Sequence, residues 1–195
     1  MGAAHVRAAV HFRQADAGDA EAIGALHADS WRRYYRGAYS DAFLDGDVLA
    51  DRVGVWTQRL GAGDPQRATI VAEKGGLIGF AHVVFDEHPT WGALLDNLHV
   101  ADGHKRGGIG SQLMRLSAEA VAASAEQQRM YLWVLEQNVI GQAFYAALGG
   151  SRVERAAVTP PGGVAGRLAG APAKLRYAWP QLGLLLAAQD ARADG

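Results

Sequence analysis

The stretch 100–114 constrains the fold most strongly, because it reads as a strand, a glycine loop and a helix in direct succession. An apolar run ends before a segment, 101–108, that is rich in glycine and cations, and a helical apolar pattern starts at Ile109. The first amides of a helix have no internal partner and point along the positive end of the helix dipole. With Lys105 and Arg106 beside them, these amides predict a phosphate-binding loop.

The glycine loop does not match two common nucleotide-binding patterns. A mononucleotide P-loop continues with Lys-Ser or Lys-Thr after its last glycine, and neither follows Gly110. A dinucleotide fingerprint needs a third glycine where Leu113 stands. A nucleotide-binding α/β protein is therefore disfavoured, although binding of ATP or NAD alone would restore that interpretation.

A second stretch, 130–150, repeats the strand-to-helix pattern. Tyr131–Leu135 is a continuous apolar run that suits a buried strand. Asn138 stands where a helix N-cap belongs, and a helical stripe that includes Phe144 follows it. Two glycines at 149–150 then supply the end of the helix.

Together these stretches resemble the GNAT superfamily of N-acetyltransferases, which bind acetyl-coenzyme A (acetyl-CoA). Lys105–Gly110 fits the family's pyrophosphate loop, [Q/R]-x-x-G-x-[G/A], with lysine in place of the usual arginine or glutamine. The order strand, Asn, Phe-Tyr helix and Gly in the second stretch is also that of the family. The resemblance runs from about Phe12 to Trp179 and implies an acetyl-CoA-dependent N-acetyltransferase that needs no metal.

The 195 residues predict one domain, with a core at about 10–179 and a C-terminal tail at 181–195. The expected strands are 10–14, 68–73, 77–86, 93–100, 131–135, 151–159 and 174–179. The expected helices cover about 19–35, two pieces for which Ser40 and Asp47 are the expected caps, and segments starting at 109 and 139. The fold class is therefore α/β (α+β), a mixed, mainly antiparallel sheet with helices on both faces. The resemblance adds that strands four and five splay apart.

Composition excludes several functional classes. The net charge of −1, without a basic stripe, disfavours a general nucleic-acid binder. The absence of cysteine excludes disulfides, Cys-ligated zinc and an acyl-cysteine route. No apolar run reaches the ~20 residues of a membrane span, and Met1–Ala9 does not read as a signal peptide, so we expect a cytoplasmic protein. The leucines of 182–186 lie either in a helix packed on the fold or in the interface of a homodimer.

The resemblance implies a site for each part of acetyl-CoA. Its pyrophosphate would be held at Lys105, Arg106, Gly107, Gly108, Ile109, Gly110 and Ser111. The pantetheine amides would pair with the strand-four backbone of Leu98, His99 and Val100, as a peptide adds to a sheet edge. One of these backbone amides would polarise the acetyl carbonyl. Asn138 would contact the pantetheine arm as well as cap its helix, whereas the ring of His99 is expected to be packed or exposed rather than catalytic.

The implied reaction is direct attack of an amine on the thioester, which needs a general base and a general acid. Tyr145 matches the family's acid position, and a phenol with a pKa of about 10 suits a departing thiolate; otherwise Tyr145 is a core aromatic residue. The family's usual glutamate position falls on Leu94, which accepts no proton. Asp96, two residues on and on the same face, is the first candidate for the base. Asp96 could instead anchor substrate or accept a structural hydrogen bond.

Glu87 and His88 are second candidates for the base, and some relatives use ordered water. The acceptor would contact Trp31, Tyr34, Tyr35 and Glu87, unless the aromatic cluster merely covers the sheet. The sequence does not distinguish a small amine, an amino acid, an antibiotic or a peptide amine as acceptor. A non-catalytic acyl-CoA binding module is the alternative function, which Leu94 keeps open and Tyr145 opposes.

Overall fold

The computed structural model describes residues 9–193, with side chains described through 187, so positions 1–8 and the last two residues of the predicted tail lie outside the description. The strands are β1 (His11–Gln14), β2 (Arg67–Glu73), β3 (Leu77–His88), β4 (Gly92–Val100), β5 (Met130–Leu135), β6 (Ser151–Ala157) and β7 (Ala173–Trp179). The helices are α1 (Ala20–Tyr34), α2 (Asp41–Asp45), α3 (Val48–Gly61), α4 (Ile109–Ser124), α5 (Val139–Ala147) and α6 (Leu182–Ala193). Among the described residues, no helix combines the length and apolarity that crossing a membrane requires.

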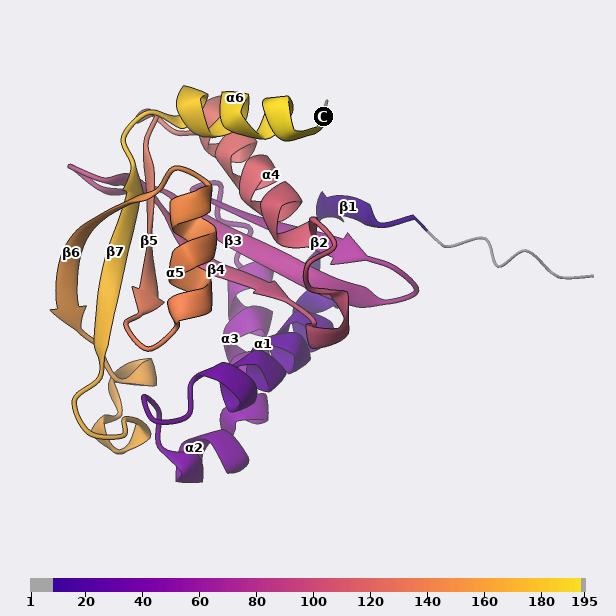
Figure 1. The fold of residues 1–195 in the computed structure, drawn as a ribbon. Helices are drawn as coiled ribbons and strands as arrows, with labels where there is room; N and C mark the ends of the chain where they lie inside the picture. Colours follow the sequence, from indigo (N-terminus) through magenta and orange to yellow (C-terminus); the bar gives the residue numbers. More distant parts are fainter. Residues whose placement is uncertain (1–8, 194–195) are drawn as a thin grey trace, which may run out of the picture.

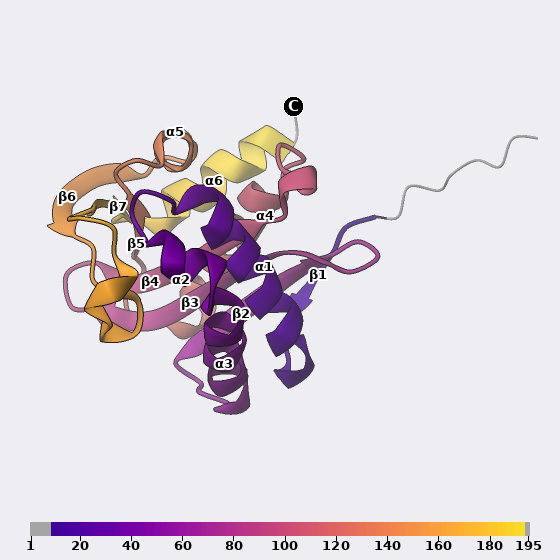
Figure 2. The same ribbon diagram turned by 90° about the horizontal axis from the view of Figure 1, so that it is seen from below.

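The seven strands form one sheet in the order β1-β2-β3-β4-β5-β7-β6 (Figure 1). All neighbours are antiparallel except β4 and β5, which run parallel. The prediction of a mixed, mainly antiparallel sheet is therefore confirmed. Helices α1 and α3 cover one face, and α4, α5 and α6 lie on the other (Figures 1 and 2).

The parallel pair β4–β5 is short. Its register consists of Ala93 opposite Met130 and Leu94 opposite Tyr131, and beyond Leu94 the two strands diverge. The edge of β4 that faces β5 is consequently unpaired over Leu98, His99 and Val100, while its other edge pairs with β3. This is the splay expected between strands four and five.

A bulge interrupts β4 next to the point of divergence. His82 lies opposite Asn97 and Val83 opposite Leu95, so Asp96 has no partner in β3. A bulge inserts one residue and re-aims the side chain that it carries. Here Asp96 projects to the face covered by α1 and α3, where it meets Arg59 of α3.

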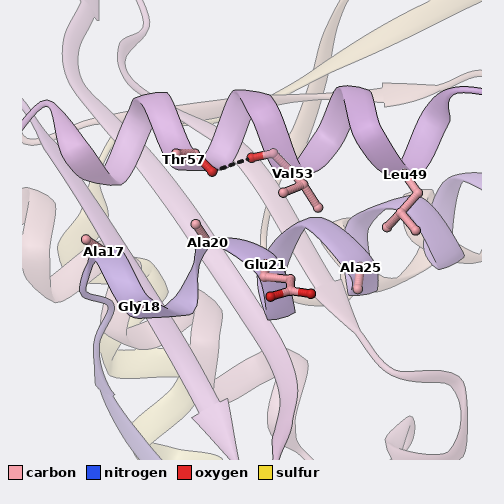
Figure 3. A pocket seen from close by; sticks show the side chains of 8 residues that line it. All are labelled: Ala17, Gly18, Ala20, Glu21, Ala25, Leu49, Val53 and Thr57. Carbon is pink, nitrogen blue, oxygen red and sulfur yellow. Dashed lines mark hydrogen bonds between the residues drawn. The ribbon is translucent and has the colours of Figure 1, made fainter.

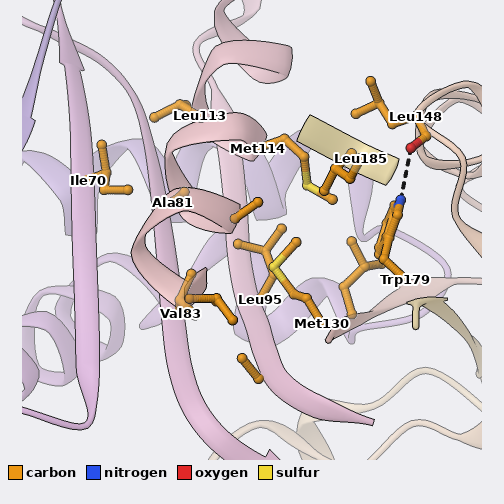
Figure 4. Packing of buried hydrophobic residues seen from close by; sticks show 14 of the residues in the cluster. Ile70, Ala81, Val83, Leu95, Leu113, Met114, Met130, Leu148, Trp179 and Leu185 are labelled. Carbon is orange, nitrogen blue, oxygen red and sulfur yellow. Dashed lines mark hydrogen bonds between the residues drawn. The ribbon is translucent and has the colours of Figure 1, made fainter. Parts of the chain in front are cut away.

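The largest apolar cluster fills the layer between the sheet and the helices α4 and α6 (Figure 4). Leu113 and Met114 of α4 are fully buried there. Leu182 and Leu185 of α6 are only 2% and 1% exposed, because they pack against this core within the same chain. Leu182 and Leu185 thus pack on the fold, as the first of the two predicted alternatives has it, whereas Leu184 of the same run is exposed.

Two predicted helix caps need correction. Ser40 and Asp47 precede α2 and α3 as expected, but neither side chain makes a capping hydrogen bond. The Ser40 hydroxyl instead donates to the carbonyl of Gly166, 2.9 Å away, in the connection from β6 to β7. A sequence pattern records that a residue can cap a helix, whereas a more distant acceptor decides where its hydroxyl points.

Candidate functional site

The loop between β4 and α4 has the features of an anion-binding site. Gly108 precedes α4 with φ +80°, a left-handed backbone conformation that glycine adopts without strain. Because glycine has no side chain to cap the helix, the first amides of α4 remain available to an outside acceptor. Lys105 and Arg106 are exposed beside them, so the loop fits a pyrophosphate group.

The two sequence stretches meet in space. A Cβ atom placed on Gly110 of α4 would lie 3.4 Å from Cζ of Phe144 in α5 and 3.9 Å from Cγ2 of Val100 in β4. The phosphate loop, the open end of β4 and the helix α5 therefore converge where the strands diverge. A ligand whose charged end occupies the loop can extend along the unpaired edge of β4.

Tyr34, one of the residues predicted to contact the acceptor, lies against the phosphate loop. Its hydroxyl donates to the carboxylate of Asp102, and Nζ of Lys105 lies 3.6 Å from the centre of its ring. Lys105 Nζ is also 3.4 Å from Asp102 Oδ1. The hydrogen bond from Tyr34 and the ion pair with Lys105 lower the pKa of Asp102. The end of α1 thereby fixes one of the two cations of the loop.

Asn138 caps α5 as predicted, since its side chain accepts a hydrogen bond from the amide of Gly141 at 2.9 Å. A Cβ at position 141 would lie 2.7 Å from Asn138 Nδ2, so this cap requires glycine there. The neighbouring Gln137 donates to the carbonyl of Arg36 at 2.8 Å. The connection from β5 to α5 is thus joined to the end of α1.

Tyr145 lies on α5, partly buried against β7. Its ring centre is 6.2 Å from that of Tyr177 and 6.3 Å from that of Trp179. Burial raises the pKa of the Tyr145 phenol, and the phenol of Tyr35 raises it further. The hydroxyl therefore keeps its proton at neutral pH, as a general acid must before it reacts.

Asp96 and Arg59 form an ion pair on the face of β4 covered by α1 and α3. Arg59 Nη1 donates to Asp96 Oδ2 at 2.7 Å, and the two side chains are 26% and 30% exposed. Burial first, and the charge of Asp96 second, raise the pKa of Tyr35 to about 12. Asp96 thus lies within electrostatic range of the aromatic cluster at the end of α1.

The aromatic residues predicted to contact the acceptor differ in exposure. Trp31 is 7% exposed and belongs to a buried cluster in which its ring centre lies 4.8 Å from that of Tyr39. The guanidinium of Arg52 covers Trp31 at 4.3 Å. Trp31 accordingly packs the helix end onto the molecule, whereas Tyr35 is partly exposed and Tyr34 and Glu87 are exposed.

The ring of His99 is packed rather than solvent-exposed. Its centre is 4.7 Å from that of His27 and 5.2 Å from that of Phe80, and burial lowers the pKa of His99 to about 4. His27 is neutral as well, because burial lowers its pKa, and its Nδ1 accepts a 3.0 Å hydrogen bond from the indole of Trp56. These two uncharged imidazoles contact each other on the face of β4 that α1 covers.

The two other candidates for the base have structural partners. His88 Nδ1 accepts hydrogen bonds from the amides of Thr90 and Trp91, at 3.1 and 3.3 Å, and so closes the turn between β3 and β4. Glu87 accepts a hydrogen bond from the hydroxyl of Tyr131 on β5. Glu87 and Tyr131 therefore bridge β3 and β5 at the paired end of the splay.

Two surface pockets are lined by residues that the sequence analysis did not assign to the site. One, of about 460 Å³, lies between α1 and α3 and is lined by residues such as Glu21 and Val53 (Figure 3). A second, of about 390 Å³, is bordered by Gly37, Gln137 and Ala173, next to the helix cap at Asn138. Within the described part of the chain, no group of three or more His, Cys, Asp or Glu side chains is arranged to hold a metal ion.

Solved structures share this fold. PaiA N-acetyltransferase from Thermoplasma acidophilum, in complex with coenzyme A, superposes with a TM-score of 0.68 at 16% identity, covering 88% of this chain and 99% of its own. YncA from Salmonella typhimurium, a putative acetyltransferase with acetyl-CoA, gives a TM-score of 0.61 at 17% identity, covering 89% and 94%. Nourseothricin acetyltransferase gives 0.60 at 22% identity, covering 88% and 98%. The fold is that of N-acetyltransferases.

The sequence pattern of the acetyltransferase (GNAT) family matches residues 25–149, from α1 to the end of α5. The chain therefore belongs to the GNAT family, and its class of activity is acyl transfer. No curated protein matches the chain in sequence.

Several side chains near the site escaped the sequence analysis. Arg59 carries no motif and reaches Asp96 only because α3 crosses the sheet beside the bulge. Arg176 and Tyr131 were interpreted only as strand residues. The alternation of polar and apolar residues in Ala173–Trp179 places Arg176 on the opposite face from the core and was the one signal available.

Proposed function

We propose that this GNAT enzyme transfers the acetyl group of acetyl-CoA to a primary amine by direct attack. The observation that carries the proposal is the unpaired edge of β4, which has the phosphate loop at its end and Tyr145 across the opening. PaiA and YncA, which share this fold, were solved with coenzyme A and acetyl-CoA.

The donor site consists of the loop and the strand edge. Lys105 and Arg106 supply charge, the amides from Gly108 to Ser111 supply hydrogen bonds, and the backbone of 98–100 offers groups that pair with pantetheine amides. Asn138 adds a side-chain amide at the head of α5. Acetyl-CoA, when bound, supplies the acetyl thioester.

Tyr145 is the proposed general acid. Burial in α5 holds its phenol protonated, and loss of the proton to a departing thiolate becomes favourable only when that charge develops close to the hydroxyl. A backbone amide from 98–100 polarises the acetyl carbonyl in the same opening.

Asp96 is the proposed general base. The bulge aims its carboxylate toward the face covered by α1 and α3, and the hydrogen bond from Arg59 orients this group. An ammonium acceptor that approaches Asp96 can give up its proton to the carboxylate, directly or through one water. The ion pair is about one-quarter to one-third exposed, so the acceptor reaches it from solvent.

Calorimetric titration with acetyl-CoA, with ATP and NAD as controls, tests the donor site. We expect a micromolar dissociation constant, or about −8 kcal/mol, for acetyl-CoA alone. Release of the thiol in the presence of a panel of amines then tests catalysis. A folded protein that binds acetyl-CoA but releases no thiol with any amine would instead be an acyl-CoA binding module.

A further inference from the structure

The proposed function assigns no role to the buried guanidinium of Arg176. Arg176 lies in the middle of β7, opposite Trp133 of β5 and Glu154 of β6, and is only 7% exposed. Its Cζ lies 4.5, 4.7 and 5.4 Å from the ring centres of Trp133, Tyr131 and Trp91. Three aromatic rings therefore exclude much of the water that would otherwise solvate this charge.

The hydrogen-bonding capacity of Arg176 is incompletely used. Nη1 is buried and has no hydrogen-bond partner among the residues that the structure describes. Nε lies 2.9 Å from Glu154 Oε2, within ion-pair distance, but the two atoms are not aligned as a hydrogen bond. Buried donors in folded proteins are nearly always paired, and an unpaired one is a place for a missing ligand or water.

Arg176 lies on the same side of the sheet as Asp96. Leu94 of β4 pairs with Tyr131 of β5, so their side chains share a face of the sheet, the face on which Asp96 also lies. Trp133, two residues along β5, shares that face and pairs with Arg176 of β7. Both charges act on the hydroxyl of Tyr131. Burial and then Glu87 are the main causes that raise the pKa of Tyr131, while the positive charge of Arg176 lowers this pKa and the charge of Asp96 raises it.

We infer that the amine acceptor carries a carboxylate and that Arg176 binds it. The inference rests on the proposed function, since it assigns the acceptor of the same site. A guanidinium presents parallel N–H groups that match the two oxygens of a carboxylate, and pairing in a water-poor aromatic setting strengthens such bonds. With Asp96 on the same face of the sheet to receive the ammonium group, the two charges suit an amino acid.

Glu154 provides a second test of the inference, because its carboxylate would compete with the acceptor carboxylate for the guanidinium of Arg176. Its side chain is 43% exposed, so it can turn into solvent when a ligand carboxylate arrives. Removing its charge should therefore improve binding of the acceptor carboxylate, whereas a purely structural ion pair would only lose stability when it is broken.

The test compares amino acids with their decarboxylated amines: phenylalanine with phenethylamine, leucine with isoamylamine, and lysine with cadaverine. The readout is the ratio of kcat/KM for each acid to that for its amine, from thiol release. We expect the wild-type ratio to exceed about ten for at least one pair. It should fall by about tenfold in Arg176→Met, in which an apolar chain of similar length preserves packing, and rise severalfold in Glu154→Gln.

Arg155→Met is the matched control, because Arg155 is an exposed arginine on β6 that pairs with Glu136 at 2.8 Å, and it should leave the ratio unchanged. Thermal unfolding of each variant verifies that it is folded. If acetyl-CoA binds but no acid is preferred over its amine, or if neither substitution moves the ratio, the inference is wrong and the proposed function stands or falls separately. Failure to bind acetyl-CoA overturns both.

Discussion

At the scale of single residues, the proposed chemistry depends on how the fold changes the acidity of one phenol, that of Tyr145. Burial of Tyr145 on α5 raises its pKa, so the proton is retained until a stronger base develops beside it. The same burial makes an alternative role as a packing residue testable, because the ring and the hydroxyl can be separated by mutation.

Replacing Tyr145 with Phe removes the hydroxyl and keeps the ring that faces Tyr177 and Trp179. We expect kcat to fall by about 100-fold, in the range typical for loss of a general acid, with the calorimetric dissociation constant of acetyl-CoA nearly unchanged. Steady-state thiol release gives kcat. An unchanged kcat would show that Tyr145 is only a core aromatic residue.

The role of a residue was predictable where it depends on neighbours in the sequence. Contacts between residues that only the fold brings together were not predictable. Asn138 caps its helix as predicted, since the cap is local in sequence. Asp96 could be singled out from strand periodicity, but its partner Arg59 is 37 residues away along the chain. Tyr34 was assigned to the acceptor together with the aromatic and cationic cluster 31–36, and its hydrogen bond to Asp102, 68 residues along the chain, leaves no local signal in the sequence.

At the scale of elements, the sequence predicted each strand of the described sheet and most strand ends to within one residue. The hairpin turn at 74–76 defines β2 and β3, and the strand–loop–helix order defines β4 and α4. The bulge at Asp96 was not predictable, because no glycine or proline marks it and only the register against β3 reveals the extra residue. The docking of α6 was likewise left open, since its apolar run suits either a core or an interface.

The end of α1 and the phosphate loop form a coupled pair of elements. Tyr34→Leu removes both the hydrogen bond to Asp102 and the ring that faces Lys105, whereas Tyr34→Phe removes only the hydrogen bond. Exposed cation–π contacts contribute about 0.5–1 kcal/mol. We therefore expect the KM for acetyl-CoA to rise by about two- to fivefold in Tyr34→Leu and by less in Tyr34→Phe, with kcat retained.

Initial rates at varied acetyl-CoA and saturating amine separate these parameters, and calorimetry checks the binding constant independently. A fall in kcat at constant KM would place Tyr34 with the acceptor, as the sequence first suggested.

At the scale of the whole molecule, stability should depend on pH through histidines buried in the uncharged form. Burial lowers the pKa of His82 and of His99 to about 4, against an unperturbed value near 6.5. Between these values the unfolded chain binds more protons than the folded one, so the free energy of unfolding decreases as the pH falls. Each such histidine contributes a slope of up to about 1.4 kcal/mol per pH unit.

Urea unfolding at pH 7.5, 6 and 5 measures this dependence, and His99→Phe should reduce its slope, because phenylalanine keeps a ring beside Phe80 and has no proton to gain. His11→Gln, on the exposed strand β1, is the control and should leave the slope unchanged. An equal slope in wild type and His99→Phe would mean that His99 is not buried in its neutral form.

The short pairing of β4 with β5 also affects how the molecule unfolds. Strands β1 to β4 form one antiparallel unit and β5, β7 and β6 another, and the backbone ladder between them consists of Ala93–Met130 and Leu94–Tyr131. Cohesion between the two units therefore rests on the side chains that they share beneath α4 and α5 rather than on the sheet. The divergence of β4 and β5, where acetyl-CoA is proposed to bind, therefore makes this seam the natural boundary between two cooperative folding units.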